Sequence, residues 1–349
     1  MLEINGTKIG NGYKPFLVAE LSANHGGDIK RAKDSMRAAK EAGANAVKIQ
    51  TYTPDTMTLN SFKEDFLIKD GLWKGYNLYQ LYKEAHTPFE WHEELFKFAK
   101  SIDLTIFSTP FDESAVDLLE KLNTPAYKIA SFEITDLPLI TYAASKQKPM
   151  LISTGMANIN EIKEAINCCN KQGNNKIIIF HCISKYPANI LEYQLGDINF
   201  LKKEFNVEIG LSDHTISNLA SSLATALGAC AIEKHFKLDE KDCGPDSSFS
   251  ITPNQLKSLV DECNLSFEAS KTNFLRRTDS EKENKKFRRS IYFIKNLSKG
   301  HILEKDDIKR IRPGYGLDPK YFDKIIGMRL SKDVEVAEAV SWNSLETKN

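Results

Sequence analysis

Two histidines follow buried-looking strands at matching positions. His214 ends the run VEIGLSDH, and His235 ends the run ACAIEKH. Largely continuous apolar runs are typical of strands in a parallel sheet, which is covered on both faces. If both strands belong to one parallel barrel, both imidazoles lie at its C-terminal rim, where barrel enzymes place their chemistry. Two neutral imidazoles on neighbouring strand ends can hold a divalent metal ion and leave its other positions open for water and substrate.

Each histidine also has a simpler interpretation, as a rim residue that is hydrogen-bonded to a neighbour. For a single histidine this simpler interpretation is favoured. The repeated placement, His214 after Ser-Asp and His235 after Glu-Lys, favours the metal site instead.

Two lysines lie within short apolar strands elsewhere in the chain, Lys48 in AVKIQT and Lys128 in AYKIAS. An unpaired buried ammonium is costly, so both positions require an anionic partner. Lysine supplies a point charge for phosphate, and nearby hydroxyls supply oriented donors. An alternative role for Lys128 is Schiff-base formation, as in class I aldolases. The histidine pair and the hydroxyls favour metal and phosphate binding.

Other polar side chains occupy the C-terminal ends of the predicted strands. Because any rim is exposed to solvent, polarity alone proves little there; the informative feature is the combination of lysines, hydroxyls and imidazoles. The strand ends carry Glu20, Lys48, Gln50, Ser108, Thr109, Lys128, Ser131, Glu133, Ser153, Thr154, Ser184, Tyr186, Ser212, Asp213, His214, Glu233 and His235. The chain has no glycine-rich phosphate loop and no dinucleotide fingerprint.

These residues need a scaffold in which strands alternate with helices. Eight strand-like runs alternate with helical segments over roughly 250 residues, which predicts an α/β protein with a (β/α)8 TIM barrel in residues 1–270. One helix is predicted to begin near Asp28 and to stop at Gly43. Asn158 and Glu161 have the spacing of a capping box at the start of another.

The barrel is followed by a change in composition. Residues 271–289 are dominated by charged side chains, so they are predicted to form a solvated helix or linker. Residues 290–349 contain short strand-like runs separated by Gly, Asp and Lys turns. They predict a second, small, β-rich domain.

The charge balance argues against polyanionic partners. Lys plus Arg and Asp plus Glu each number 47, so the net charge is zero and no long-range field recruits nucleic acid or an acidic membrane. No apolar run approaches the length of a membrane span, and no signal peptide is evident at the N-terminus. The six cysteines form no CxxC pair, so free thiols in a cytoplasmic protein are expected.

Several motifs, taken together, resemble those of a known family. In chain order, ELSANHGG, KIQTYTPDTMT, FSTPFD, YKIASFEITD, ISTGMA, GLSDHT, IEKHF and GPDSSFS follow the pattern of the sialic acid synthase family. The segments RSIYFIKNLSKGHIL and IRPGYGLDPKY resemble its C-terminal antifreeze-like module, a SAF or β-clip fold. Within the family, LSANH, TYTPDTMT and LWKGYNLYQLYKEAHTPFEWH are most similar to the pseudaminic acid synthase branch; the legionaminate and N-acetylneuraminate synthases are the alternatives.

The resemblance implies condensation of phosphoenolpyruvate with the open-chain aldehyde of an N-acetylated amino sugar, with release of phosphate. It implies that His214 and His235 hold a divalent ion, with Mn²⁺ expected and Mg²⁺ or Co²⁺ as alternatives, to polarise the aldehyde oxygen. The expected contacts to phosphate and carboxylate come from Lys48, Thr109, Lys128, Ser131, Ser153, Ser184 and Ser212. At Ser184 the N-acetylneuraminate synthases tend to have Asn.

A second set of residues is expected to handle the sugar, the water and the protons. Its members are Glu20, Gln50, Glu133, Tyr186 and Asp246, with Glu133 the first choice for the catalytic carboxylate. The resemblance also implies a domain-swapped homodimer, in which Arg312 of each small domain hydrogen-bonds an acyl group of the sugar in the partner's barrel.

Two other function classes remain as rivals. One is a metal-dependent aldolase that uses pyruvate and releases no phosphate. The other is a carbohydrate-binding or ice-binding protein whose barrel is inert. The collection of lysines, hydroxyls and histidines at the rim argues against an inert barrel, and phosphate release from phosphoenolpyruvate separates all three classes.

Overall fold

The computed structural model describes residues 2–242, 244–271 and 278–346, and the chain divides into two compact units, Met1–Lys271 and Thr272–Asn349. Of the cysteines, Cys168, Cys169, Cys182, Cys230 and Cys263 are free thiols, and Cys243 lies outside the described residues. No described helix is long and apolar enough to cross a lipid bilayer.

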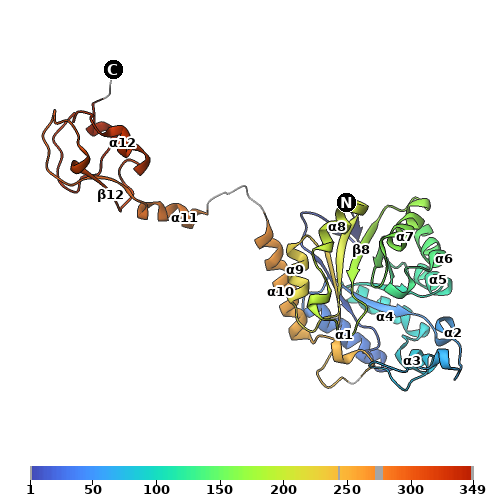
Figure 1. Cartoon of the computed structure of the whole chain (residues 1–349). Helices are drawn as coiled ribbons and strands as arrows, with labels where there is room; N and C mark the ends of the chain where they lie inside the picture. Colours follow the sequence, from blue (N-terminus) through green and yellow to red (C-terminus); the bar gives the residue numbers. More distant parts are fainter. Residues whose placement is uncertain (1, 243, 272–277, 347–349) are drawn as a thin grey trace. The chain divides into compact units, whose positions relative to one another are not determined.

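The first unit contains a closed barrel of parallel strands, which confirms the predicted (β/α)8 fold (Figure 1). The barrel closes between its first and last strands, where His235 pairs with Glu20. Its strands are β3 (Phe16–Glu20), β4 (Ala46–Thr51), β5 (Thr105–Pro110), β6 (Tyr127–Ile129), β7 (Met150–Ser153), β8 (Ile177–Cys182), β9 (Glu208–Asp213) and β10 (Ala231–His235).

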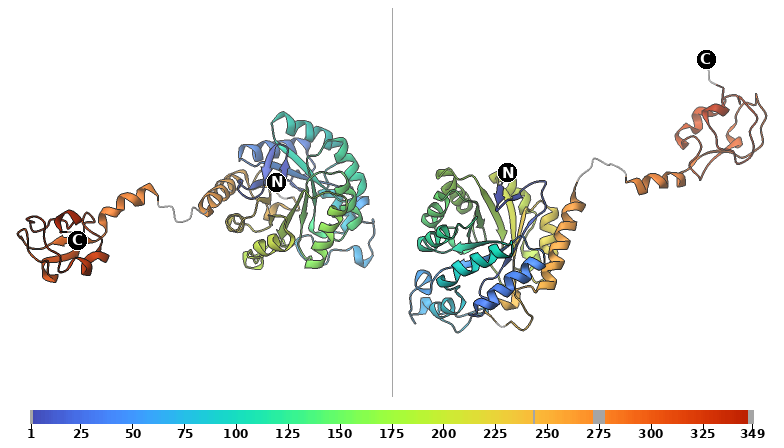
Figure 2. Two further views of the ribbon diagram at one scale, coloured as in Figure 1. Left: turned by 90° about the horizontal axis from the view of Figure 1, so that it is seen from above. Right: turned by 180° about the vertical axis from the view of Figure 1, so that it is seen from behind.

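Helices surround the strands (Figure 2). They are α1 (Ile29–Glu41), α4 (Phe89–Ser101), α5 (Glu113–Lys121), α6 (Leu137–Ser145), α7 (Ile159–Lys171), α8 (Asp197–Phe205), α9 (Leu219–Ala226) and α10 (Pro253–Ser270). As predicted, Gly43 follows the end of α1, with φ +94°, and Asn158 and Glu161 form a capping box on α7; Asp28 caps the start of α1. Local sequence therefore determines where these helices begin and end.

Successive residues of each strand face opposite sides of the barrel wall. In β9 and β10, Leu211 and Ile232 belong to the apolar layer shared with the helices. Phe16 and Ala231 instead pack inside the barrel with the N-terminal hairpin. At the C-terminal ends of the same strands, the inward positions become polar, and these positions form the site described below.

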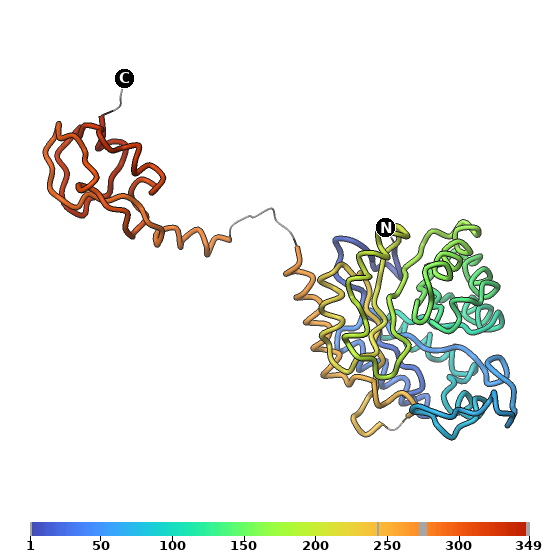
Figure 3. Tube along the Cα trace, in the orientation of Figure 1, coloured from blue at the N-terminus to red at the C-terminus, as the bar shows by residue number. Residues whose placement is uncertain are grey.

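The two ends of the barrel are covered by different segments (Figure 3). A hairpin of β1 (Leu2–Ile4) and β2 (Thr7–Ile9) closes the N-terminal end, and its turn is made by Asn5 and Gly6, both with positive φ. At the other end, the segment between β4 and α4 contains α2 (Pro54–Met57), the 3-10 helix Glu64–Phe66 and α3 (Leu78–Ala85).

The second unit is small and has its own apolar core, made by Ile291, Phe293, Leu303, Leu330 and Val340 among others. The described part of the predicted linker forms α11 (Asp279–Glu283) and the 3-10 helix Asn284–Phe287. The remaining elements are β11 (Ser290–Phe293), β12 (Ile308–Ile311), α12 (Phe322–Ile325) and the 3-10 helices Lys305–Asp307, Pro319–Tyr321 and Trp342–Ser344. β11 and β12 pair antiparallel, an isolated bridge joins Tyr292 of β11 to Ala339, and further isolated bridges join other segments of the unit, as expected for a β-rich domain.

Candidate active site

A cavity of about 420 Å³ opens at the C-terminal end of the barrel. Its lining combines charged strand-end residues with an aromatic and aliphatic wall. The sequence-predicted residues that line it are Lys48, Gln50, Lys128, Ser131, Glu133, Ser153, Tyr186, Ser212, His214, His235 and Asp246. These residues come from strands far apart in the chain, and barrel closure brings them together.

The floor of the cavity holds two lysines and two glutamates in a buried network. Lys48 Nζ lies 2.9 Å from Glu20 Oε2 and 3.4 Å from Glu233 Oε1, and Lys128 Nζ lies 3.2 Å from Glu233 Oε2. Lys48 also donates to Thr109 Oγ1 at 3.0 Å. Burial lowers the pKa of Lys128, and Glu233 opposes this shift. The two ammonium groups are therefore held rigidly and close together, which suits binding of a compact anion.

A group of small polar residues lies beside Lys128. Ser131 Oγ accepts a hydrogen bond from the Gly155 N–H at 3.2 Å, and the hydroxyls of Ser153 and Ser184 are buried without a hydrogen-bond partner among the described residues. A Cβ atom at position 155 would lie 2.1 Å from Ser184 Oγ and 2.9 Å from Ser131 Oγ. Only glycine leaves room here, and the Ser131 and Ser153 hydroxyls line the cavity beside the Lys128 ammonium, where oxygen atoms of a ligand can meet them.

The histidine pair lies at the rim of the same cavity. The ring centroids of His214 and His235 are 5.5 Å apart, and Tyr186 packs 4.4 Å from the His214 ring. His214 Nδ1 lies 2.7 Å from the Ile183 carbonyl oxygen. Because a carbonyl only accepts, Nδ1 carries the proton, and Nε2 keeps a free lone pair. Burial lowers the pKa of His235 well below its usual value, so its imidazole is neutral.

A chain of hydrogen bonds crosses the cavity beside the histidines. Gln50 Nε2 donates to Glu20 Oε1 at 3.2 Å and to Ser22 Oγ at 3.1 Å, and Ser22 Oγ donates to Asp246. Asp246 Oδ2 in turn lies 4.0 Å from His235 Nδ1. These polar side chains are oriented toward one another across three strand ends, and together they can recognise hydroxyl and amide groups of a ligand.

The opposite wall of the cavity is apolar and comes largely from the segment between β4 and α4. The aromatic part is made by Tyr52, Trp73, Tyr82, Phe111 and Phe249, and the aliphatic part by Met57, Ile68, Leu78 and Leu81. Trp73 Nε1 donates to the Pro245 carbonyl at 3.1 Å, so this segment is joined to the loop that carries Asp246. An apolar wall opposite polar strand ends suits a ligand with methyl groups on one side.

Glu133 lines the cavity and makes no ion pair with the two lysines. Burial raises the pKa of Glu133 to about 7 from its usual value of 4.5, and the charge of Asp136 adds to this shift. Its Oε2 atom is buried without a hydrogen-bond partner among the described residues. A carboxyl group with a pKa near neutrality can gain or lose a proton at working pH.

We expect Glu133→Gln to lower kcat by about 10²-fold or more. The kcat of the wild-type enzyme should rise as the pH passes through about 7, and the kcat of the variant should not show this rise. In the folded protein Glu133 keeps its proton at pH values where the unfolded chain has lost it, between 4.5 and about 7. Its contribution to stability therefore falls as pH rises across this window, and Glu133→Gln should flatten that fall. Rate profiles and thermal unfolding between pH 5 and 8 measure both effects. An unchanged rate profile in the variant would remove Glu133 from the proton chemistry.

Four sequence-predicted residues do not line the cavity. Glu20 and Thr109 are fully buried beneath it and contact Lys48. Ser184 stands behind Gly155. Arg312 is exposed in the second unit. The sequence analysis missed the central role of Glu233, which ion-pairs with both lysines, although its strand-end position was the available signal. Tyr52, Trp73 and Tyr82 also line the cavity, although none of them was among the predicted site residues.

Comparisons with known proteins identify the family of this chain. Residues 35–273 match the NeuB family model, and residues 288–346 match the SAF domain model. A pseudaminic acid synthase of Helicobacter pylori is 46% identical, over 95% of this chain and 98% of that protein. One from Campylobacter jejuni is 42% identical, over 94% and 95%. The crystal structure of the spore coat polysaccharide biosynthesis protein SpsE from Bacillus subtilis has a TM-score of 0.67 at 33% identity and covers 99% of both chains.

The lysine-and-hydroxyl floor, the histidine pair at the rim and the similarity over nearly the whole chain thus converge on one conclusion: this chain belongs to the NeuB family, and a SAF domain follows its barrel.

Proposed function

We propose that this chain is a pseudaminic acid synthase. It would join phosphoenolpyruvate to the open-chain aldehyde of 2,4-diacetamido-2,4,6-trideoxy-altropyranose, form a carbon–carbon bond and release phosphate. The observation that carries the proposal is a single cavity in which paired lysines and free hydroxyls face a histidine pair and an apolar wall. The two pseudaminic acid synthases at 46% and 42% identity support this choice of sugar.

Phosphoenolpyruvate fits the floor of the cavity. Its phosphate and carboxylate need positive charge and hydroxyl donors, which Lys48, Lys128, Ser131 and Ser153 supply within one region. The Ser153 hydroxyl has no partner among the described residues, so a ligand oxygen would satisfy it without breaking a bond inside the protein. Glu20 and Glu233 hold the lysines in place beneath the ligand.

His214 and His235 fit a divalent metal ion, for which we expect Mn²⁺. His235 Nδ1 is buried without a hydrogen-bond partner among the described residues, and His214 Nε2 is left free by the bond of Nδ1 to Ile183. Two imidazoles from the chain would leave the other positions of the ion to water and substrate. When bound, the ion would polarise the aldehyde oxygen as a Lewis acid.

The remaining chemistry falls to groups of the chain. C3 of phosphoenolpyruvate attacks the aldehyde carbon, which leaves a positive charge at C2, and the aldehyde oxygen takes up a proton to become a hydroxyl. Water adds at C2 and gives up a proton, and cleavage of the bond between C2 and the phosphate oxygen releases phosphate and leaves a ketone at C2. Glu133 is suited to accept the proton that the water gives up, because its pKa lies at about 7 and its Oε2 atom has no other partner among the described residues. Gln50, Asp246 and Tyr186 would hold the sugar beside the histidines, and the apolar wall would contact its C6 methyl and acetyl groups.

The proposal is tested by product identity. The enzyme is incubated with Mn²⁺, phosphoenolpyruvate and a panel of 2,4-diacetamido-2,4,6-trideoxy hexoses together with N-acetylmannosamine, and nine-carbon products and free phosphate are measured. We expect the altro-configured diacetamido sugar to give the highest kcat/KM, with one phosphate released per product. Preference for another stereoisomer or for N-acetylmannosamine would assign a legionaminate or N-acetylneuraminate synthase. Turnover with pyruvate, or no turnover, would favour the aldolase or the binding protein.

The working form that we propose is a domain-swapped homodimer in the cytoplasm. In the second unit, Arg312 is exposed, and among the described residues its guanidinium makes no hydrogen bond or ion pair. A guanidinium with free donors suits an acyl oxygen of the sugar. In the dimer, that sugar would be bound by the barrel of the partner.

A further inference from the structure

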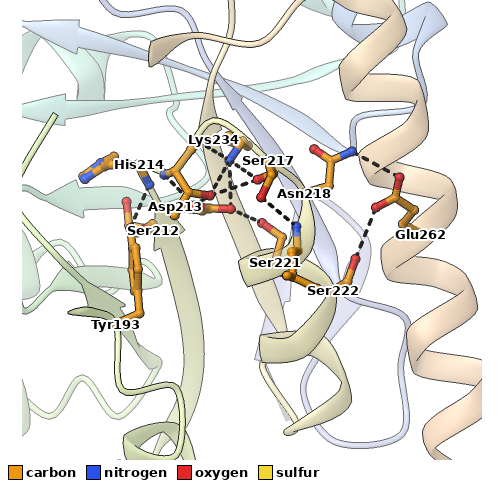
Figure 4. Close-up of polar contacts among 12 residues, drawn as sticks. Tyr193, Ser212, Asp213, His214, Ser217, Asn218, Ser221, Ser222, Lys234 and Glu262 are labelled. Carbon is orange, nitrogen blue, oxygen red and sulfur yellow. Dashed lines mark hydrogen bonds and ion pairs between the residues drawn. The ribbon is translucent and has the colours of Figure 1, made fainter. Parts of the chain in front are cut away.

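The residues that precede the two histidines form a second pair, on the other side of the barrel wall. Strand alternation directs Ser212 and Glu233 into the cavity and turns Asp213 and Lys234 toward the helix layer. Asp213 and Lys234 are register partners on β9 and β10. Their side chains are completely buried, 0% exposed, with Lys234 Nζ 2.9 Å from Asp213 Oδ2 (Figure 4).

This ion pair also holds the loop that follows His214. Lys234 Nζ donates to the carbonyl oxygens of Thr215 at 2.6 Å and Ser217 at 3.0 Å. Asp213 Oδ1 accepts from the N–H and the hydroxyl of Thr215, both at 2.8 Å, and Oδ2 accepts from Ser221 Oγ at 2.6 Å. The pair is hydrogen-bonded on every side, and nearly all of these bonds end on residues within three positions of His214.

Two further bonds act on His214 itself. Its backbone N–H donates to Tyr193 Oη at 2.8 Å, and Tyr193 Oη donates to the Ser212 carbonyl at 2.9 Å (Figure 4). Its ring is oriented by the bond from Nδ1 to the Ile183 carbonyl at 2.7 Å. Hydrogen bonds thus restrain both the backbone and the ring of His214. The position of this ring relative to His235 depends on the register of β9 and β10, which the Asp213–Lys234 ion pair fixes.

We propose that Asp213 and Lys234 are positioning residues for the metal: their buried ion pair sets the spacing and orientation of the two imidazoles from behind. This inference rests on the proposed metal role of His214 and His235. A buried ion pair adds little net stability compared with an apolar pair of the same volume, and its best-attested use is to specify one register. Partners that orient metal ligands typically change metal affinity by about 10- to 100-fold when they are removed.

The test is a titration of metal-free protein with Mn²⁺ alone, in which unbound Mn²⁺ is measured by electron paramagnetic resonance. We expect Lys234→Met and Asp213→Asn each to raise the Kd for Mn²⁺ by about 10-fold or more. The double variant should bind Mn²⁺ no more weakly than the worse single variant, because the two residues act as a unit. Ser221→Ala, which removes one donor to Asp213, is the milder variant and should raise the Kd by about threefold.

A matched control is available on the same strand. Lys202 and Glu208 form a part-buried ion pair at 3.1 Å at the N-terminal end of β9, away from the histidines. Lys202→Met should leave the Kd for Mn²⁺ within twofold of wild type, even where thermal unfolding shows a loss of stability. If the substitutions only destabilise the fold, Lys202→Met and the variants at 213, 221 and 234 should behave alike. If Asp213 and Lys234 position the histidines, only the variants at 213, 221 and 234 should bind Mn²⁺ more weakly.

His235→Ala in the same titration separates the two proposals. If wild-type protein binds Mn²⁺ no better than His235→Ala, the metal role itself is wrong. If His235→Ala loses binding while folded Lys234→Met and Ser221→Ala keep the wild-type Kd, the metal role stands and the positioning inference is overturned. Should Lys234→Met not fold, an unchanged Kd in Ser221→Ala is sufficient to overturn it.

Discussion

His235→Ala is expected to lower kcat/KM by roughly 10²- to 10⁴-fold, since Lewis-acid polarisation of the aldehyde contributes several kcal/mol to the transition state. Exhaustive chelation of wild-type enzyme should abolish product formation, and added Mn²⁺ should restore it. The fold should persist, because His235 lies at the rim and its Nδ1 bonds to no described residue. Steady-state kinetics and thermal unfolding of the same preparations measure both effects.

His92 provides a matched control for the loss of a histidine. It is fully buried and lies 2.8 Å from Thr51 Oγ1 through Nε2, yet it does not line the cavity. His92→Gln should keep activity and Mn²⁺ dependence within a few-fold of wild type. Full activity of His235→Ala, or of chelated enzyme, would contradict the metal role of the rim.

Arg312→Ala is expected to be nearly inactive on its own and to be rescued by His235→Ala when the two proteins exchange subunits. If Arg312 serves the partner's barrel, a mixed dimer has one site with both defects and one site with neither. After random exchange, half of the dimers are mixed and each has one intact site, so roughly a quarter of wild-type activity should return. The measurement is product formation before and after mixing under conditions that allow exchange.

The second unit holds the Arg312 segment in a defined conformation. Ser290 Oγ donates to the Pro313 carbonyl at 2.7 Å and accepts from the Gly316 N–H at 2.9 Å. A Cβ atom at Gly316 would lie 2.4 Å from the Ile291 carbonyl oxygen, so this turn packs directly on β11. Arg312→Lys is the informative companion variant: it keeps the charge but loses the planar fork of donors, and it should restore only part of the activity.

Two outcomes would contradict the role of Arg312 in the partner's site. No recovery after verified subunit exchange would mean that Arg312 acts on its own barrel. A fully active Arg312→Ala enzyme would mean that the residue lies outside the site. With either outcome, the proposed chemistry of the barrel would be unaffected. The second outcome would also mean that Arg312 of the small domain does not contribute to substrate binding.

The local sequence determined most of the architecture. Apolar runs predicted the strands, the capping box of Asn158 and Glu161 predicted a helix start, and a polar residue at the end of an apolar run marked the rim. These features depend on neighbours within a few residues of one another, so they can be read without knowing the fold. For that reason His214 and His235 were predicted at the rim, where the structure places both of them.

Only the tertiary structure decided which of these groups meet. Barrel closure and register place Glu233 between Lys48 and Lys128, and the same register pairs Asp213 with Lys234 behind the histidines. Trp73 reaches the cavity because the long segment after β4 folds over the rim and bonds to the loop after β10. The contacts of Glu233 with the two lysines and of Trp73 with Pro245 join residues more than a hundred positions apart. Their distances depend on how all eight strands close, which no local pattern records.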